Sequence, residues 1–277
     1  MLYDYSNKFK SMERRMRMSK PIVIAIANQK GGVGKTTTST ALAAGLKDKG
    51  FKVLAIDADP QGNFSDTAGA ETQESQTLYD LMKGDCVVED CIQGLDRFDI
   101  IPANIMLAGL ETEMSQLGKE QRLKEKISPV LKKYDYIIID TPPSLGILTI
   151  NAFTFANQII IPTQAGIYAA GGMIQLNTTI NNVRKYCNNP ELVVAGVLIT
   201  RFNPRANLSK DMKELTEKIG KELSLPIFET YIRNSIQIEE AQANRLDIFS
   251  YSPTSTVGQD YSAFIDEYLD MNKNREG

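Results

Sequence analysis

Residues 28–37 constrain this chain more than any other stretch. They read Asn-Gln-Lys-Gly-Gly-Val-Gly-Lys-Thr-Thr and directly follow the apolar run 21–27. A strand that enters a glycine-rich turn and then a helix gathers backbone N–H groups around oxyanions, and the helix dipole adds to their attraction. The predicted phosphate-binding loop consists of Lys30, Gly31, Gly32, Val33, Gly34, Lys35, Thr36 and Thr37. We expect Lys35 to reach the β- and γ-phosphates and the Thr36 hydroxyl to serve Mg²⁺.

Strand-like apolar runs alternate with helical patterns along the chain, which is typical of a parallel sheet with crossover helices. The predicted strands are 22–27, 52–56, 98–101, 136–139, 158–161 and 193–199. The predicted helices cover roughly 36–49, 119–133, 169–187 and 207–222. Several strands are apolar throughout, as central strands covered on both faces are. We therefore expect an α/β fold, a doubly wound, mostly parallel sheet flanked by helices, as a single domain over residues 20–277.

The first 19 residues have a different character. Apolar residues recur there at three- and four-residue spacing, which predicts an apolar helix stripe, and much of the rest is basic. We interpret residues 1–19 as a basic amphipathic extension. It could dock on its own domain or on a twin subunit, contact a membrane surface or DNA, or remain a tail.

Composition excludes several classes of protein. The chain has 31 basic and 34 acidic residues, a net charge of −3, which argues against a protein that coats nucleic acid but leaves room for a local basic patch. The absence of histidine excludes Ser–His and Cys–His nucleophiles and histidine-ligated zinc. Cys86, Cys91 and Cys187 are an odd, scattered set that suggests neither disulfides nor a metal site. Without a membrane-length apolar run or a signal-peptide core, we expect a cytoplasmic protein with no transmembrane segment.

Three aspartates follow predicted strands. Asp57 and Asp59 come after the run 52–56, and Asp140 ends the run 136–139. Carboxyl ends of strands beside the phosphate-loop strand face the nucleotide crevice of a doubly wound sheet. Asp140 fits the carboxylate that holds the Mg²⁺ shell in phosphoryl-transfer enzymes. A single aspartate there could simply cap a helix, but the phosphate-binding loop and these aspartates in this order at strand ends predict nucleoside-triphosphate binding.

The order of these motifs resembles the ParA/MinD superfamily of ATPases, whose phosphate loop has a deviant spacing. The standard loop would place glycine at 29, where this chain has Gln29, and Lys30 is additional. Segments 51–63, 140–152 and 161–164 look like the signature blocks of small, Soj-like ParA proteins, which segregate plasmids and chromosomes. The resemblance covers roughly residues 20–268.

The resemblance implies a weak, partner-stimulated ATPase with ATP and Mg²⁺ as cofactors. It implies that Lys30 crosses a homodimer interface to the partner's nucleotide and that Asp59 orients the attacking water. Thr36, Asp57 and Asp140 would surround Mg²⁺. With Lys30, Lys35 and Asp59 in the catalytic roles, ATP would drive dimerisation and hydrolysis would release the dimer.

The residues that contact the nucleotide base and DNA follow less directly from the sequence than the phosphate-binding loop does. Arg201 and Asn203 resemble the family's base-binding turn, although either could cap the following helix. The resemblance also implies non-specific binding of double-stranded DNA in the ATP state and a small centromere-binding, ParB-like partner, hence nucleoid association. It points to Arg205, and the other candidate DNA-binding residues are Arg184, Lys185, Lys210, Lys213 and Arg233. Gln237 stands where relatives often have arginine.

Three other functions share this loop. A MinD-like, membrane-associated positioning ATPase would end in a basic amphipathic helix, whereas residues 264–271 are acidic, so only the N-terminal stripe could serve. An iron–sulfur carrier needs paired interfacial cysteines, which these three do not provide. A metabolic ligase with the same loop stays open.

Overall fold

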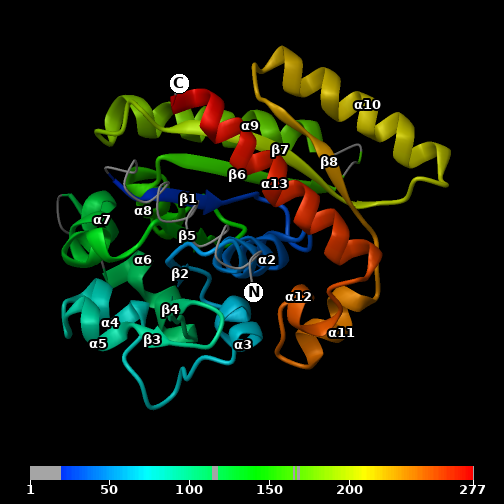
Figure 1. The fold of residues 1–277 in the computed structure, drawn as a ribbon. Helices are drawn as coiled ribbons and strands as arrows, with labels where there is room; N and C mark the ends of the chain where they lie inside the picture. The colour runs from blue at the N-terminus through cyan, green and yellow to red at the C-terminus, as the bar shows by residue number, and fades with distance from the viewer. Residues whose placement is uncertain (1–19, 114–117, 165, 167–168, 277) are drawn as a thin grey trace.

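The computed structural model describes residues 20–113, 118–164, 166 and 169–276 (Figure 1). The predicted amphipathic extension, residues 1–19, lies outside the described residues. Within the described part of the chain, no helix is long and apolar enough to cross a membrane.

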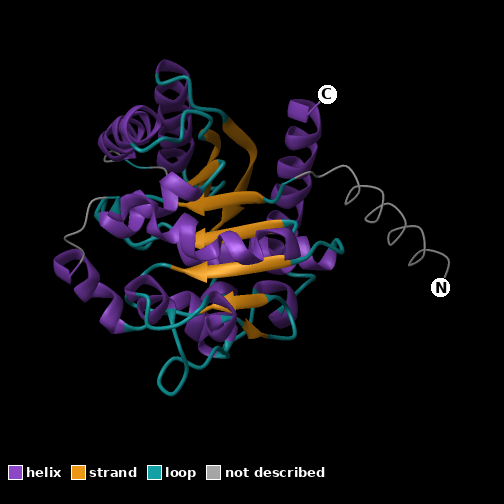
Figure 2. Ribbon diagram, turned by 90° about the vertical axis from the view of Figure 1, so that its left-hand side faces the viewer, coloured by secondary structure: helices purple, strands orange, loops and turns teal. Residues whose placement is uncertain are grey.

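A single eight-stranded sheet organises the chain. Its strands are β1 (Ile22–Ile26), β2 (Val53–Asp57), β3 (Gln93–Gly94), β4 (Asp99–Ile101), β5 (Tyr136–Asp140), β6 (Gln158–Gln164), β7 (Val193–Phe202) and β8 (Ile227–Arg233). They lie in the order β3-β4-β2-β5-β1-β6-β7-β8, and only the short pair β3–β4 is antiparallel. The central strands point the same way (Figure 2), so their carboxyl ends meet at one edge.

Helices cover both faces of this sheet (Figure 1). The α-helices are α2 (Lys35–Asp48), α3 (Asn63–Ala68), α4 (Leu78–Lys83), α5 (Val88–Cys91), α6 (Leu110–Glu113), α7 (Arg122–Ile127), α8 (Ile147–Phe155), α9 (Ala169–Tyr186), α10 (Asn207–Glu222), α11 (Gln237–Ala243), α12 (Ile248–Tyr251) and α13 (Thr256–Glu276). Short 3₁₀ helices are η1 (Ile105–Gly109), η2 (Lys119–Gln121) and η3 (Ser128–Lys133).

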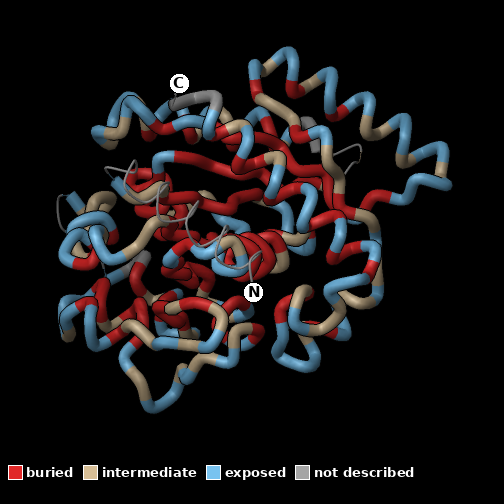
Figure 3. The backbone as a smooth tube through the Cα atoms, viewed as in Figure 1, coloured by how far each residue is buried: buried red, intermediate tan, exposed pale blue. Residues whose placement is uncertain are grey.

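Successive side chains of each strand point to opposite faces of the sheet, so the core forms two layers. Val23 and Ala25 of β1 belong to a cluster that includes side chains of α4, α7, α8 and α9. Ile24 and Ile26 face the other way, into a cluster with α2, α12 and α13. Because both faces are covered, the central strands are buried throughout (Figure 3), as their unbroken apolar sequences predict.

The predicted α/β class is confirmed, although the short strand β3 and the helices α3–α6, α8 and α11–α13 were not predicted. The region 119–133 is not one helix but the succession η2, α7 and η3. Pro129 sits at the start of η3 and has no N–H to donate into a continuous helix. Edge strand β8 was also not predicted, although its β-branched and aromatic residues are typical of a strand.

Candidate active site

The phosphate loop is fixed in shape by its glycines and by two neighbouring strands. Gly32 and Gly34 have φ of 72° and 85°, a backbone region that glycine adopts without strain. The Thr200 hydroxyl at the end of β7 donates to the Val33 carbonyl oxygen at 2.8 Å. Asn28 donates through Nδ2 to the Pro162 carbonyl oxygen of β6 at 2.8 Å. The loop is therefore held at the carboxyl edge of the sheet before any ligand arrives.

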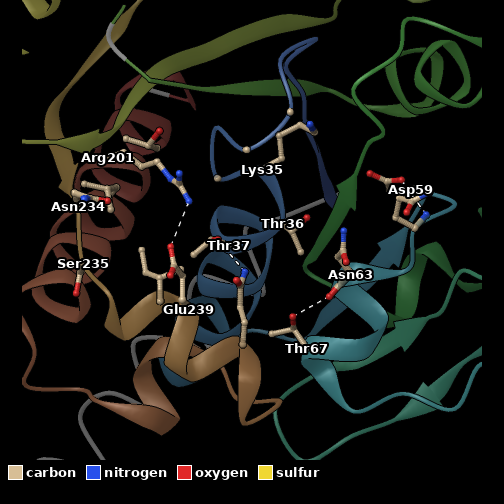
Figure 4. Close-up of a pocket in the computed structure, with 18 of the residues that line it drawn as sticks. Lys35, Thr36, Thr37, Asp59, Asn63, Thr67, Arg201, Asn234, Ser235 and Glu239 are labelled. Atoms are coloured by element: carbon tan, nitrogen blue, oxygen red, sulfur yellow. Dashed lines mark hydrogen bonds and ion pairs between the residues drawn. The ribbon is translucent and has the colours of Figure 1, made fainter.

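A pocket of about 450 Å³ opens beside this loop (Figure 4). Its floor is formed by Gly31, Gly32, Gly34, Lys35, Thr36 and Thr37. Asp59, Gln61 and Asn63 line one side, from the segment after β2. Arg201 of β7 lies opposite them, across Lys35. The volume lies in the range of small-molecule and cofactor sites.

The buried carboxylates lie under the loop. Asp140 accepts hydrogen bonds from the hydroxyls of Thr36 at 2.7 Å and Ser39 at 2.8 Å. Asp57 accepts from the backbone N–H of Ser65 at 2.8 Å and from its hydroxyl at 2.7 Å. Both carboxylates are fully buried. Carboxylate and hydroxyl oxygens are the ligands that Mg²⁺ prefers, so Thr36, Asp57 and Asp140 suit a magnesium ion next to the phosphates.

Burial dominates the electrostatics of these groups. It raises the pKa of Asp57 to about 6 and that of Asp140 to about 7, and the Asp57 charge also raises the pKa of Asp140. Burial lowers the pKa of Lys35, although Asp140 and Asp59 act in the opposite direction. Two neighbouring buried carboxyls are costly to ionise at the same time. They fit a site in which a divalent cation balances their negative charges.

These shifts predict how the metal-free protein responds to pH. Both carboxyls have a folded-state pKa above the unfolded value, so the native state binds more protons between about pH 4 and pH 7. The free energy of unfolding should fall as pH rises through that window. Asp140→Asn removes one of the groups and should gain stability over the natural protein, by more than about 1 kcal/mol near pH 8 and little near pH 4.

Urea unfolding in a chelator at several pH values measures this difference. The control is Asp85→Asn, which changes an exposed aspartate after α4 and should show no pH-dependent gain. A gain for Asp140→Asn that is the same at every pH would contradict the assigned burial effect.

Some predicted nucleotide contacts do not line the pocket in this structure. Lys30 is exposed, and its backbone N–H donates to Asn28 Oδ1 at 3.0 Å. Val33 is buried and does not line the pocket. Asn203 accepts from the backbone N–H of Arg205 at 3.0 Å, a local turn contact, and does not cap α10, whose N-cap is Ala206. Contacts of Lys30 and Asn203 with a nucleotide stay predictions.

One wall of the pocket was missed by the sequence analysis. It consists of Ile232, Asn234, Ser235, Ile238, Glu239 and Gln242, from the end of β8 and from α11. Gln242 Nε2 donates to the Thr37 hydroxyl at 3.3 Å, and Glu239 lies 3.9 Å from Arg201 (Figure 4). The signal that could have found this wall is the strand-forming sequence of β8, since the wall begins where that strand ends.

The candidate DNA-binding residues differ in their exposure and in whether their side chains already have partners within the protein. Arg205 and Lys210 are exposed beside α10, which lies at the periphery (Figure 3). Lys213 pairs with Glu217 at 3.1 Å on that helix. Arg184 donates to the Leu192 carbonyl oxygen at 2.7 Å, and Lys185 lies over the Tyr186 ring at 4.9 Å.

Arg233 has a structural partner that the sequence did not reveal. Its Nη2 lies 2.5 Å from Asp260 Oδ1, and its Nε also donates to this largely buried carboxylate. Such a multidentate pair positions β8 on α13 and takes up much of the guanidinium's hydrogen-bonding capacity. Arg233 is therefore the weakest member of the predicted DNA-binding set.

Comparison with known proteins agrees with this geometry. The family described as AAA domain matches residues 21–194. The sporulation initiation inhibitor protein Soj of Bacillus subtilis is 41% identical over 243 residues, 86% of this chain and 94% of Soj. The chromosome partitioning protein ParA of Caulobacter vibrioides is 36% identical over 261 residues, 92% of this chain and 96% of that protein.

The chain belongs to the Soj/ParA family. Identity of this level over nearly the whole of both relatives confirms the resemblance based on the phosphate loop and the aspartates. Among solved structures, cobyrinic acid a,c-diamide synthase from Mycobacterium smegmatis, with bound ATP analogue and magnesium, is 31% identical with a TM-score of 0.79. The match covers 91% of this Soj/ParA chain and 96% of the synthase.

Proposed function

We propose that this chain is an ATP-dependent partition ATPase that dimerises with ATP, binds DNA non-specifically and segregates a plasmid or chromosome with a ParB-like, centromere-binding partner. The observation that carries the proposal is the meeting of Lys35, Thr36 and Asp59 at one pocket in a chain 41% identical to Soj. ATP and Mg²⁺ are its cofactors, and the synthase structure with ATP analogue and magnesium supports that assignment. We place the protein in the cytoplasm, on the nucleoid.

Hydrolysis in this proposal depends on positioning and charge. The loop N–H groups and Lys35 hold the phosphates, while Thr36, Asp57 and Asp140 hold Mg²⁺, which neutralises charge on the phosphate oxygens. Asp59 is 7% exposed and lines the pocket, and it accepts the Gln61 N–H at 3.0 Å. A carboxylate held there can orient a water for attack.

Dimerisation in this proposal depends on Lys30. Its side chain is exposed at the start of a loop whose following residues line the pocket. An exposed cation that does not line its own site can complete the site of a facing copy, where it would stabilise negative charge on the phosphates. ATP occupancy would thereby control association, and a stimulating partner would shorten the life of the dimer.

DNA binding in this proposal uses the exposed cations near α10. Phosphate contacts need only positive charge and carry no sequence information, so a modest patch doubled by dimerisation suffices. Arg205 and Lys210 are its core, Lys213 lies on the same helix, and Arg233 is least available. Arg184 and Lys185 lie beside Leu192 at the start of β7, the end of that strand away from Arg205, so they are separate from this patch.

Two variants separate these steps. Lys30→Gln should reduce both the dimer fraction and ATP-dependent DNA binding, because the cross-interface cation is lost. Arg205→Glu should keep the dimer but weaken binding to all DNA sequences alike. Light scattering with a non-hydrolysable ATP analogue and fluorescence anisotropy with two unrelated duplexes measure the two properties.

The salt dependence of DNA binding is a further expected result. If the natural dimer neutralises about four phosphates, the logarithm of its DNA association constant should fall with the logarithm of the salt concentration at a slope of roughly −3.6.

Lys132→Glu is the matched control, since it makes the same charge change in η3, near α7 on the other side of the molecule (Figure 1). It should alter neither property. Tight DNA binding without nucleotide, or a strong preference for one duplex, would contradict the proposal. If Lys30→Gln forms the same fraction of dimer as the natural protein, Lys30 does not act across the dimer interface.

A second candidate function, an ATP-dependent ligase, is favoured by the 31% identity to the synthase structure. The same experiment decides between them, because a ligase would show no ATP-dependent DNA binding.

A further inference from the structure

Two thiols outside the nucleotide pocket lie close together. The Sγ atoms of Cys86 and Cys91 are 3.0 Å apart. Cys86 follows α4, and Cys91 ends the single turn of α5, which turns it back toward Cys86. We propose that Cys86 and Cys91 form a reversible intrachain disulfide, which makes the α4–α5 corner a thiol-oxidation site. The scattered cysteines had suggested no disulfide from the sequence, since spacing alone does not show the turn between them.

Little movement separates the thiol pair from a bond. A disulfide is about 2.05 Å long, so the two sulfur atoms must approach by roughly 1 Å, a change that small side-chain rotations supply. The backbone before Cys86 is already anchored. The N–H groups of Gly84 and Asp85 donate to the Asp80 carbonyl oxygen at 3.0 Å each. Cys91 Sγ has only weak contacts to the carbonyl oxygens of Thr77 and Val87, at 3.6 and 3.7 Å, which a bond to Cys86 would readily replace.

Accessibility gives the two thiols different roles. Cys86 is half-buried and can be reached from solvent, whereas Cys91 is buried. Burial raises the pKa of the Cys91 thiol, and the adjacent Cys86 sulfur acts in the same direction. Because the thiolate is the nucleophile, Cys86 reacts first with an oxidant and Cys91 completes the reaction.

The oxidant is a low-molecular-weight disulfide such as glutathione disulfide. The Cys86 thiolate attacks one of its sulfur atoms, breaks its S–S bond and releases one thiolate. Cys91 then loses its proton and attacks Cys86 Sγ, which breaks the mixed disulfide and releases the second thiolate. Two protein thiols are oxidised and one small disulfide is reduced to two thiols. Excess glutathione runs the same steps backward.

Trypsin makes the test direct. Cleavage after Lys83 and Arg97 leaves both cysteines in the peptide 84–97, while Cys187 falls in the peptide 186–201. The full-length protein is equilibrated with glutathione and glutathione disulfide at graded ratios, quenched with acid and N-ethylmaleimide, digested and analysed by mass spectrometry. We expect peptide 84–97 to lose two hydrogen atoms and to take up no maleimide, and dithiothreitol to restore two reactive thiols.

Two variants and the unfolded chain complete the experiment. Cys91→Ser should stop at a mixed disulfide of Cys86 with glutathione, and Cys187→Ser should behave like the natural protein. At one glutathione ratio, the native protein should form the bond at least about 10-fold more favourably than the chain unfolded in urea, because the fold brings the thiols together. Two alkylated cysteines in peptide 84–97 at excess glutathione disulfide, or equal bond formation in the native and unfolded chains, would overturn the proposal.

Discussion

Lys35→Ala should weaken ATP binding by at least about 100-fold. Lys35 lines the pocket floor at the start of α2, and the residue is 7% exposed. A charge-assisted hydrogen bond contributes about 1.5–3 kcal/mol, and this ammonium can reach more than one phosphate oxygen. Alanine leaves the loop N–H groups in place but removes the cation, so affinity for the triphosphate should collapse. Titration calorimetry with ATP and magnesium measures the loss.

Lys47→Ala is the matched control, because it removes an exposed lysine from the last turn of the same helix. It should bind ATP as the natural protein does. The fold of Lys35→Ala should survive, since burial lowers the pKa of Lys35 and disfavours its charge. Near-normal ATP affinity in a folded Lys35→Ala protein would refute the assignment of the phosphate site.

Asp59→Ala should bind ATP but hydrolyse it roughly 100-fold more slowly or worse. Its carboxylate lies across the pocket from Arg201 (Figure 4), two residues after the end of β2. Loss of a group that positions or activates water costs about 100- to 10,000-fold in rate. ATP would then persist, and the protein should accumulate as the nucleotide-bound dimer. Phosphate release and light scattering on the same sample measure both effects.

Asp85→Ala removes an exposed aspartate after α4 and should leave hydrolysis unchanged. Asp59→Asn should resemble Asp59→Ala in rate, because the amide keeps the shape but not the charge. If either Asp59 variant hydrolyses ATP at the natural rate, the water-positioning role belongs to another residue.

The sequence by itself determined the chemistry of the phosphate site. A glycine-rich turn between an apolar strand and a helix works through backbone N–H groups, and these are specified locally by Gly32, Gly34 and the adjacent strand. The α/β class was equally predictable, since unbroken apolar strands require cover on both faces. The positions of Asp57 and Asp140 at the edge of the sheet followed from where their strands end, because parallel strands share that edge.

Tertiary structure alone decided which distant residues complete the site and which charges are already paired. The wall from Asn234 to Gln242 lines the pocket only because β8 adds to the sheet beside β7. Arg233 appeared as a free cation in the sequence, but α13 brings Asp260 against it. Cys86 and Cys91 became a pair only through the turn of α5. In each case the deciding contact joins groups whose proximity depends on the path of the backbone, which spacing along the chain does not encode.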